Sequence, residues 1–272
     1  MLTVKVDTSG LARLQAELAG KGKQVKFATS RALNAAAYKA KVETEKEIAR
    51  VFDRPTPWVS KSVRYTKSNV ASASRGRAEK LFATIDFEAW GNKQGVTASQ
   101  VLNAEIHGGA RRLKRFEVAL NRIGVLPDGM AAVPGKRVKL DQYGNVPASL
   151  IVQVLSYFQA FGEQGYKANS TVKTRAKRWK GTKKTGGFEF FSLAQPQGKL
   201  LPGIYMRKNY SAGDRGAVGH LQRGAAFPIF IFVPIPKYKR RFDFYGKIER
   251  VAVDEFDRTF PGFLDDAMRT AR

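Results

Sequence analysis

The longest uninterrupted pattern of apolar and polar positions lies near the start of the chain, from Lys23 to Phe52. No proline or glycine occurs in this stretch, and Ala, Lys, Glu, Arg and Leu, which all favour helices, dominate it. Small and apolar residues recur at three- and four-residue steps, which predicts a narrow stripe along one helix face. The stripe consists of Leu33, Ala36, Ala37, Ala40, Thr44, Ile48 and Val51. Pro55 and Pro57 end the predicted helix.

Two interpretations of this stripe are open. Small side chains let another backbone approach closely, and that backbone can belong to the same domain or to a neighbouring subunit. The plainer interpretation is a core helix of a mixed domain. The sharper one is an assembly face within a ring of subunits, formed by Leu33, Ala36, Ala37 and Ala40.

The rest of the chain predicts short strands and helices in mixed order. Alternating patterns predict strands at 2–6, 81–88, 137–140, 188–193, 203–207 and 227–233. Helical spacing predicts helices at 11–18, 57–63, 101–123 (divided at 107–109), 150–161 and 246–271. Pro228 places the start of its strand at an edge or entry point, and Pro261 with Gly262 is expected to kink or divide the closing helix. The pattern predicts an α+β fold, with a mainly antiparallel sheet packed against a long N-terminal helix and a C-terminal helix.

We expect one α+β domain over residues 1–272, since this length is ample for a hydrophobic core. Two insertions interrupt it. A basic, flexible, linker-like stretch covers about 162–187, and a Gly-rich stretch covers about 211–224. No internal repeat is visible.

Charge changes this picture more than any other property of the composition. The chain has 48 Lys and Arg against 23 Asp and Glu, a formal net charge of +25, while its 43% hydrophobic content is that of a folded protein. Such an excess calls for a polyanionic partner or an acidic protein neighbour. A membrane partner is not expected, because no stretch approaches the roughly 20 apolar residues of a span. We expect no signal peptide, and the absence of cysteine excludes disulfides and thiolate zinc sites.

Two basic clusters are candidate contacts for DNA or for an acidic partner. The first comprises Lys173, Arg175, Lys177, Arg178, Trp179, Lys180, Lys183 and Lys184. The second comprises Arg111, Arg112, Lys114 and Arg115, at the start of a predicted helix, where cations oppose the helix dipole. We expect the segment 173–184 to be disordered alone and ordered by an anionic partner. The alternative for both clusters is a solvated basic segment without a partner.

Residues suited to catalysis are scarce. The two histidines, His107 and His220, lie beside glycines and lack metal-ligand spacing. A Glu-x-Lys or Asp-x-Lys pair would suggest a metal-dependent nuclease, but neither occurs in the sequence. Neither a phosphate loop nor a dinucleotide fingerprint is present. The pairs Asp86/Glu88 and Asp265/Asp266 are interpreted as surface charges. The sequence therefore predicts no catalytic, cofactor or metal site.

Four features of the layout carry a family resemblance. They are Leu11 and Leu14 on a first helix before Arg31-Ala32-Leu33-Asn34-Ala35-Ala36, then Pro57-Trp58-Val59 with Val63-Arg64-Tyr65, then Gly108-Gly109-x-Arg111-Arg112, and finally aromatic strands leading into a closing helix. Together they resemble the tail-completion and minor tail proteins of tailed bacteriophages, in particular the minor tail protein Z group of phage lambda and related neck proteins. The resemblance covers chiefly about the first 125 and about the last 50 residues. The insertions around Trp179 and Gly213 depart from it.

The resemblance implies a structural tail or neck protein of the virion, assembled in the host cytoplasm. Such a protein would form a homo-oligomeric ring, six-fold by family analogy, that joins the tail to the head connector and lines the DNA path. Its partners would be further copies of itself, tail-tube and head-connector proteins, and DNA backbone without sequence specificity.

Two other hypotheses stay open: a non-virion, sequence-independent nucleic-acid-binding protein, and a nuclease with an unfamiliar site. Oligomeric state and gene neighbourhood separate the first of these from a tail protein. A divalent-metal-dependent cleavage assay separates the nuclease from both.

Overall fold

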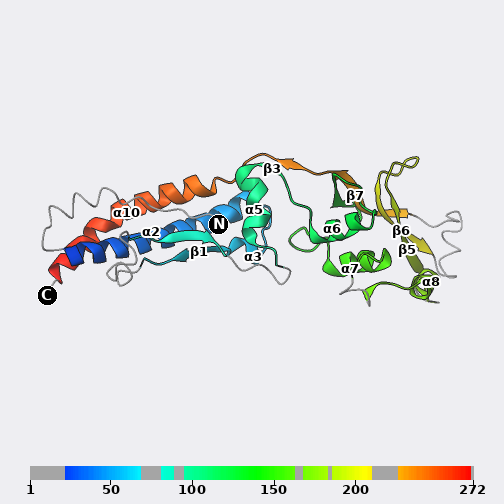
Figure 1. Cartoon of the computed structure of the whole chain (residues 1–272), viewed down its shortest axis with the longest axis horizontal. Helices are drawn as coiled ribbons and strands as arrows, with labels where there is room; N and C mark the ends of the chain where they lie inside the picture. The colour runs from blue at the N-terminus through cyan, green and yellow to red at the C-terminus, as the bar shows by residue number, and fades with distance from the viewer. Residues whose placement is uncertain are drawn as a thin grey trace. The chain divides into compact units, whose positions relative to one another are not determined.

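The chain forms two compact units in the computed structural model, which describes residues 22–68, 81–88, 95–162, 168–182, 186–209 and 226–270 (Figure 1). Unit 1 comprises Met1–Gly109 and Tyr238–Arg272, and unit 2 comprises Ala110–Lys237. This differs from the single domain expected, because each unit has a hydrophobic core of its own. The predicted elements at 2–6 and 11–18 and the Gly-rich stretch 211–224 lie outside the described residues.

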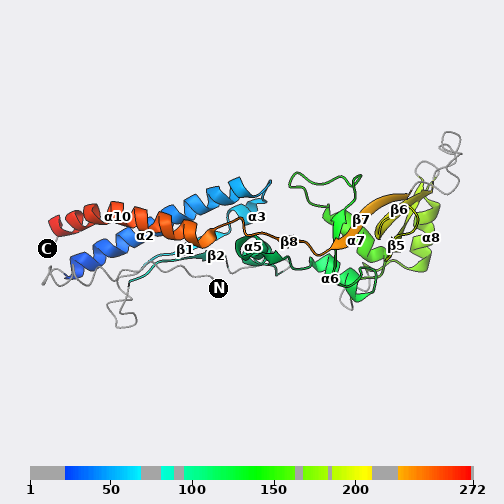
Figure 2. The same ribbon diagram turned by 90° about the horizontal axis from the view of Figure 1, so that it is seen from above.

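Unit 1 is built on two long helices that lie side by side (Figures 1 and 2). The predicted N-terminal helix is confirmed as α2 (Gly22–Val51), and the closing helix is α10 (Phe244–Arg269). Ion pairs between neighbouring turns, such as Lys41–Glu45 at 2.8 Å, line the solvent side of α2. The helix α10 continues through Pro261 as one helix and is not divided there.

The remaining elements of unit 1 are short. They are α3 (Pro57–Ser60), β1 (Val63–Thr66), β2 (Thr84–Phe87) and α5 (Ala98–His107). The strands β1 and β2 pair antiparallel, with Val63 opposite Phe87. Helix α3 begins at Pro57, as predicted, but ends before Val63, which starts a strand. At the start of α5, the Thr97 hydroxyl accepts a hydrogen bond from the Gln100 N–H.

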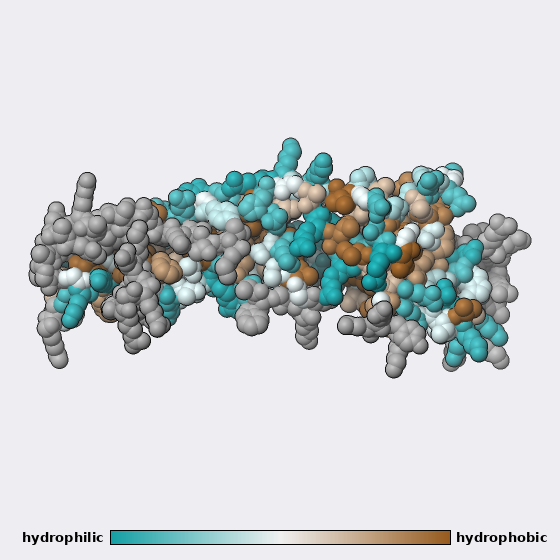
Figure 3. Space-filling view, in the orientation of Figure 1, coloured by the Kyte–Doolittle hydropathy of each residue, from teal (hydrophilic) through white to brown (hydrophobic). Residues whose placement is uncertain are grey.

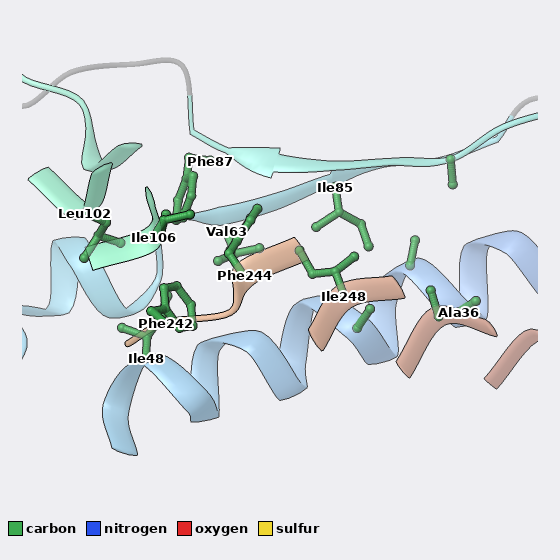
Figure 4. Close-up of a cluster of buried hydrophobic side chains, with 14 of the residues drawn as sticks. Ala36, Ile48, Val63, Ile85, Phe87, Leu102, Ile106, Phe242, Phe244 and Ile248 are labelled. Carbon is green, nitrogen blue, oxygen red and sulfur yellow. The ribbon is translucent and has the colours of Figure 1, made fainter. Parts of the chain in front are cut away.

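The small-residue stripe of α2 lies inside the core of unit 1. Exposure is 1% for Leu33, 0% for Ala36 and Ala40, and 4% for Ala37. They belong to one apolar cluster with residues of β1, β2, α5 and α10, some of which Figure 4 shows as sticks. The stripe is therefore a core face of the same chain, and not a surface open to a neighbouring subunit.

Unit 2 contains a four-stranded antiparallel sheet in the order β4-β7-β6-β5. Its strands are β4 (Met130–Pro134), β5 (Gly187–Leu193), β6 (Gly203–Asn209) and β7 (Ala226–Pro234). Three of these strands match predicted ones, but β4 was not predicted, and residues 137–140 form no strand. Pro228 pairs with Tyr205 just beyond a shift in register, which places this proline of an inner strand at an irregularity.

Helices α6 (Arg115–Arg122) and α7 (Ala148–Tyr157) complete the core of unit 2. The Phe116 ring of α6 lies 5.2 Å from the Phe230 ring of β7, and the Tyr157 ring of α7 lies 5.4 Å from that of Phe190 on β5. The two-residue strands β3 (Gly109–Ala110) and β8 (Lys237–Tyr238) pair where the chain passes from one unit to the other. These observations confirm the α+β class with antiparallel sheets and two long terminal helices.

Candidate nucleic-acid interface

Positive charge is concentrated in unit 2. Between Ala110 and Lys237 the sequence holds 22 Lys and Arg against six Asp and Glu, a net charge of +16. The remainder of the chain holds 26 Lys and Arg against 17 Asp and Glu, a net charge of +9. The smaller share of the chain therefore carries most of its excess charge.

The described carboxylates of unit 2 are engaged within the unit. Glu189 on β5 accepts hydrogen bonds from Arg207 on β6. Asp128 accepts a 2.8 Å hydrogen bond from the Asn121 side-chain amide, and Asp141 accepts two backbone N–H groups of the turn that follows it. The fourth described carboxylate, Glu117, is buried. The described cations of unit 2 therefore greatly outnumber its described carboxylates.

The first basic cluster lies on a helix as far as Lys180, where the sequence predicted a disordered segment over 173–184. Helix α8 (Val172–Lys180) is capped by Thr171, whose hydroxyl accepts a 3.2 Å hydrogen bond from the Thr174 N–H. Lys177, Arg178 and Lys180 occupy its last turn, where cations are favoured by the helix dipole. Lys173, Lys177 and Lys180 are exposed, whereas Lys183 and Lys184 lie outside the described residues.

Trp179 has a packing role in this helix. The Arg207 guanidinium lies 5.4 Å from the centre of its ring, and its backbone carbonyl accepts a 2.9 Å hydrogen bond from the Asn209 side chain. The backbone of α8 comes so close to β5 that a Cβ on Gly187 would lie 1.9 Å from the Trp179 carbonyl oxygen. Trp179 therefore anchors α8 to the sheet, with its ring partly covered by Arg207.

The second basic cluster is divided by the fold. Arg111 donates two hydrogen bonds to the Glu117 carboxylate, at 2.7 and 2.6 Å, and only 17% of its side chain is exposed. The backbone N–H groups of Lys114 and Ala132 donate to the same carboxylate at 2.6 and 2.8 Å. Arg111 is consequently a structural residue. The side chains of Arg112, Lys114 and Arg115 remain at the surface.

Glu117 is fully buried and fastens the entry segment of unit 2 to strand β4. Burial alone would raise the pKa of this carboxyl group, because it disfavours the charged form. The hydrogen bonds from Arg111, Lys114 and Ala132 outweigh burial and lower the pKa of Glu117 below its ordinary value. The site therefore holds a buried carboxylate in its charged form.

Another group of cations in unit 2 was not singled out from the sequence. Arg137 and Lys208 both lie over the Phe227 ring, at 5.0 and 5.5 Å from its centre. Both side chains are exposed. They come from different segments, since Lys208 is on β6 and Arg137 follows β4. No sequence pattern links them, because the sheet alone brings them together.

Unit 2 also exposes apolar side chains. Val118 on α6 and Val152 on α7 are 52% and 49% exposed. On the face shown in Figure 3, brown apolar residues gather over the region of α6 and β7. Within the described ranges, no three or more His, Asp or Glu side chains are grouped as metal ligands, and no helix is long and apolar enough to cross a membrane.

Comparison with known proteins finds no counterpart for this arrangement. No family model matches the chain. No curated protein and no solved structure matches it either. Functional inference therefore rests on the charge and contacts of unit 2, together with the layout of the sequence.

Proposed function

We propose that this chain is a structural protein of a bacteriophage tail, acting in tail completion or in the neck rather than as an enzyme. Several copies form a ring that joins the tail to the head connector, and unit 2 meets the DNA that passes through it. Neighbouring tail-tube and head-connector proteins complete the assembly. The place in the virion comes from the resemblance of the sequence layout, and the charge of unit 2 supports it.

The observation that carries the proposal is the net charge of +16 in unit 2, whose described carboxylates are already engaged. Closing a ring multiplies this charge, so that the unit 2 parts of six copies together carry a net charge of about +96. Like charges at this density destabilise an assembly unless a polyanion neutralises them. In the proposed neck, the DNA that passes from head to tail is such a polyanion.

Removing the coding sequence from the phage that carries it tests this function. We expect lysates with DNA-filled heads and separate tails, because the ring that joins them is missing. Electron microscopy counts joined and separate particles, and expression of the intact chain in trans should restore joining. Particles that join normally without the chain would contradict the proposal.

A non-virion nucleic-acid-binding protein is the second candidate, because the same charge of unit 2 supports it. The two candidates differ in where the protein is found after assembly. A tail or neck protein stays with purified, nuclease-treated virions in a fixed number of copies. A DNA-coating protein is lost during purification, or varies in amount with the DNA.

A further inference from the structure

Four cations of unit 2 lie over three half-buried aromatic rings. Arg175 lies 5.7 Å from the ring centre of Tyr157, and Arg178 lies 5.7 Å from that of Phe188. Lys208 and Arg137 share the Phe227 ring, at 5.5 and 5.0 Å. We name Arg175, Tyr157, Arg178, Phe188, Lys208, Phe227 and Arg137 the cation–aromatic stripe.

The register of the sheet links the strand residues of this stripe, Phe188, Lys208 and Phe227. Phe188 on β5 is the direct partner of Lys208 on β6, so their side chains share one face of the sheet. Lys208 then reaches Phe227 on β7, which also carries Arg137. The stripe thus crosses three adjacent strands, roughly 10 Å at the usual strand spacing. Its cations form a row that the fold holds in place.

The rings hold these cations without using their hydrogen-bond donors. A cation attracted to the face of a ring keeps its N–H groups available for an acceptor on the other side. The ion pairs Arg111–Glu117 and Arg207–Glu189 of unit 2 include no stripe cation. One guanidinium nitrogen of Arg178, Nη1, is buried without a hydrogen-bond partner among the described residues, and Arg175 is half-buried. The exposed cations of the stripe are therefore Lys208 and Arg137, and neither forms an ion pair with a described carboxylate.

We propose that the cation–aromatic stripe binds the sugar-phosphate backbone of nucleic acid without reading its sequence. A row of ordered cations fits a polymer whose phosphates repeat at short, regular intervals, and arginine matches phosphate geometry with paired donors. The stripe rings already carry cations, so the contact is to phosphates rather than to stacked bases. This inference rests on the proposed function only in assuming that unit 2 meets a polyanion. It adds that the polyanion is nucleic acid and that the stripe residues bind it.

Binding of the purified full chain to a random-sequence DNA duplex over a series of salt concentrations tests the stripe. The test variant is Arg137→Gln with Lys208→Gln, and the matched control is Lys199→Gln with Lys237→Gln. All four side chains are exposed, belong to unit 2 and lose one charge each. At about 0.1 M salt we expect the test variant to bind roughly tenfold to sixtyfold more weakly, with a salt slope lower by about two. The control should change affinity by about twofold or less, since its cations lie outside the stripe.

Equal losses in the two double variants would overturn the stripe as a site, because only total charge would then matter. Poly-glutamate that competes as well as DNA at equal charge would also overturn it, in favour of an acidic protein partner. If thermal unfolding shows that the double variant is destabilised, Lys208→Gln alone should lower the slope by about one. Head–tail joining is measured separately, because it tests the proposed function and not the stripe. If the stripe variant binds DNA normally but loss of the chain prevents joining, the stripe is wrong and the tail function stands. If the stripe variant loses DNA binding but particles join without the chain, the stripe stands and the tail function is wrong.

Discussion

Replacing Ala36 and Ala40 together by leucine should lower the free energy of unfolding of unit 1 by about 2–6 kcal/mol. Both side chains are fully buried in the apolar cluster that α2 shares with α10 and the β1–β2 pair. Each added side chain overpacks that core, because protein interiors are close-packed and leave little room beside a fully buried alanine. Denaturant unfolding followed by circular dichroism measures the change.

Ala49→Leu is the matched control for this variant. Ala49 lies on the same helix but is exposed, so the same substitution should change stability by no more than about 0.5 kcal/mol. A double variant as stable as the unaltered protein would mean that the small-residue stripe of α2 faces solvent. The assembly interpretation of Leu33, Ala36, Ala37 and Ala40 would then return.

Glu117→Gln should destabilise unit 2 by about 3–5 kcal/mol, the usual cost of removing one partner from a buried ion pair. The amide replaces one carboxylate oxygen by a donor that faces the donors of Arg111, Lys114 or Ala132. Glu189→Gln is the control, because its pair with Arg207 is partly exposed and should cost about 1 kcal/mol or less. Equal effects of the two substitutions would contradict the structural role of Glu117.

The same carboxylate predicts a pH dependence. Its pKa is lower in the folded protein than the ordinary value of 4.5, so the unfolded chain takes up the proton first as the pH falls. The stabilisation by Glu117 is therefore complete above the unfolded pKa and is lost as the pH falls through the folded pKa. The difference in stability between the unaltered protein and Glu117→Gln should shrink in acid. A difference that stays constant from neutral pH into acid would contradict this assignment.

The long helices and three strands of the larger sheet could be predicted from local patterns in the sequence. A periodic or continuous apolar run marks each of the helices α2 and α10 and the strands β5, β6 and β7, and that local run is enough to predict the element. The strand β4 (Met130–Pro134) was missed because its sequence has two adjacent alanines at its centre and no alternation of apolar and polar residues. Its pairing with β7 defines it. The alternation at 137–140 gave a false strand. Directly before it, the Gly135 N–H donates to the Ile229 carbonyl, and the chain then turns away.

The candidate site was predictable in charge but not in geometry. The basic residues of 173–180 were visible, yet their helix depends on a cap at Thr171 and on close packing against Gly187. In the sequence, Arg111 could not be distinguished from the basic residues beside it, although it forms an ion pair with the buried carboxylate of Glu117, six residues later. Lys208 and Arg137 belong together only through Phe227, which lies on a third segment. Division into two units also depends on contacts between distant segments, which periodicity does not report.

Electron cryo-microscopy of purified virions tests the central claim most directly. We expect density for this chain as a closed ring between tail and head connector, with unit 2 and its cation–aromatic stripe facing the DNA path. The copy number should equal the symmetry of that ring. Virions that lack the chain, or a ring in which unit 2 faces away from the DNA, would contradict it.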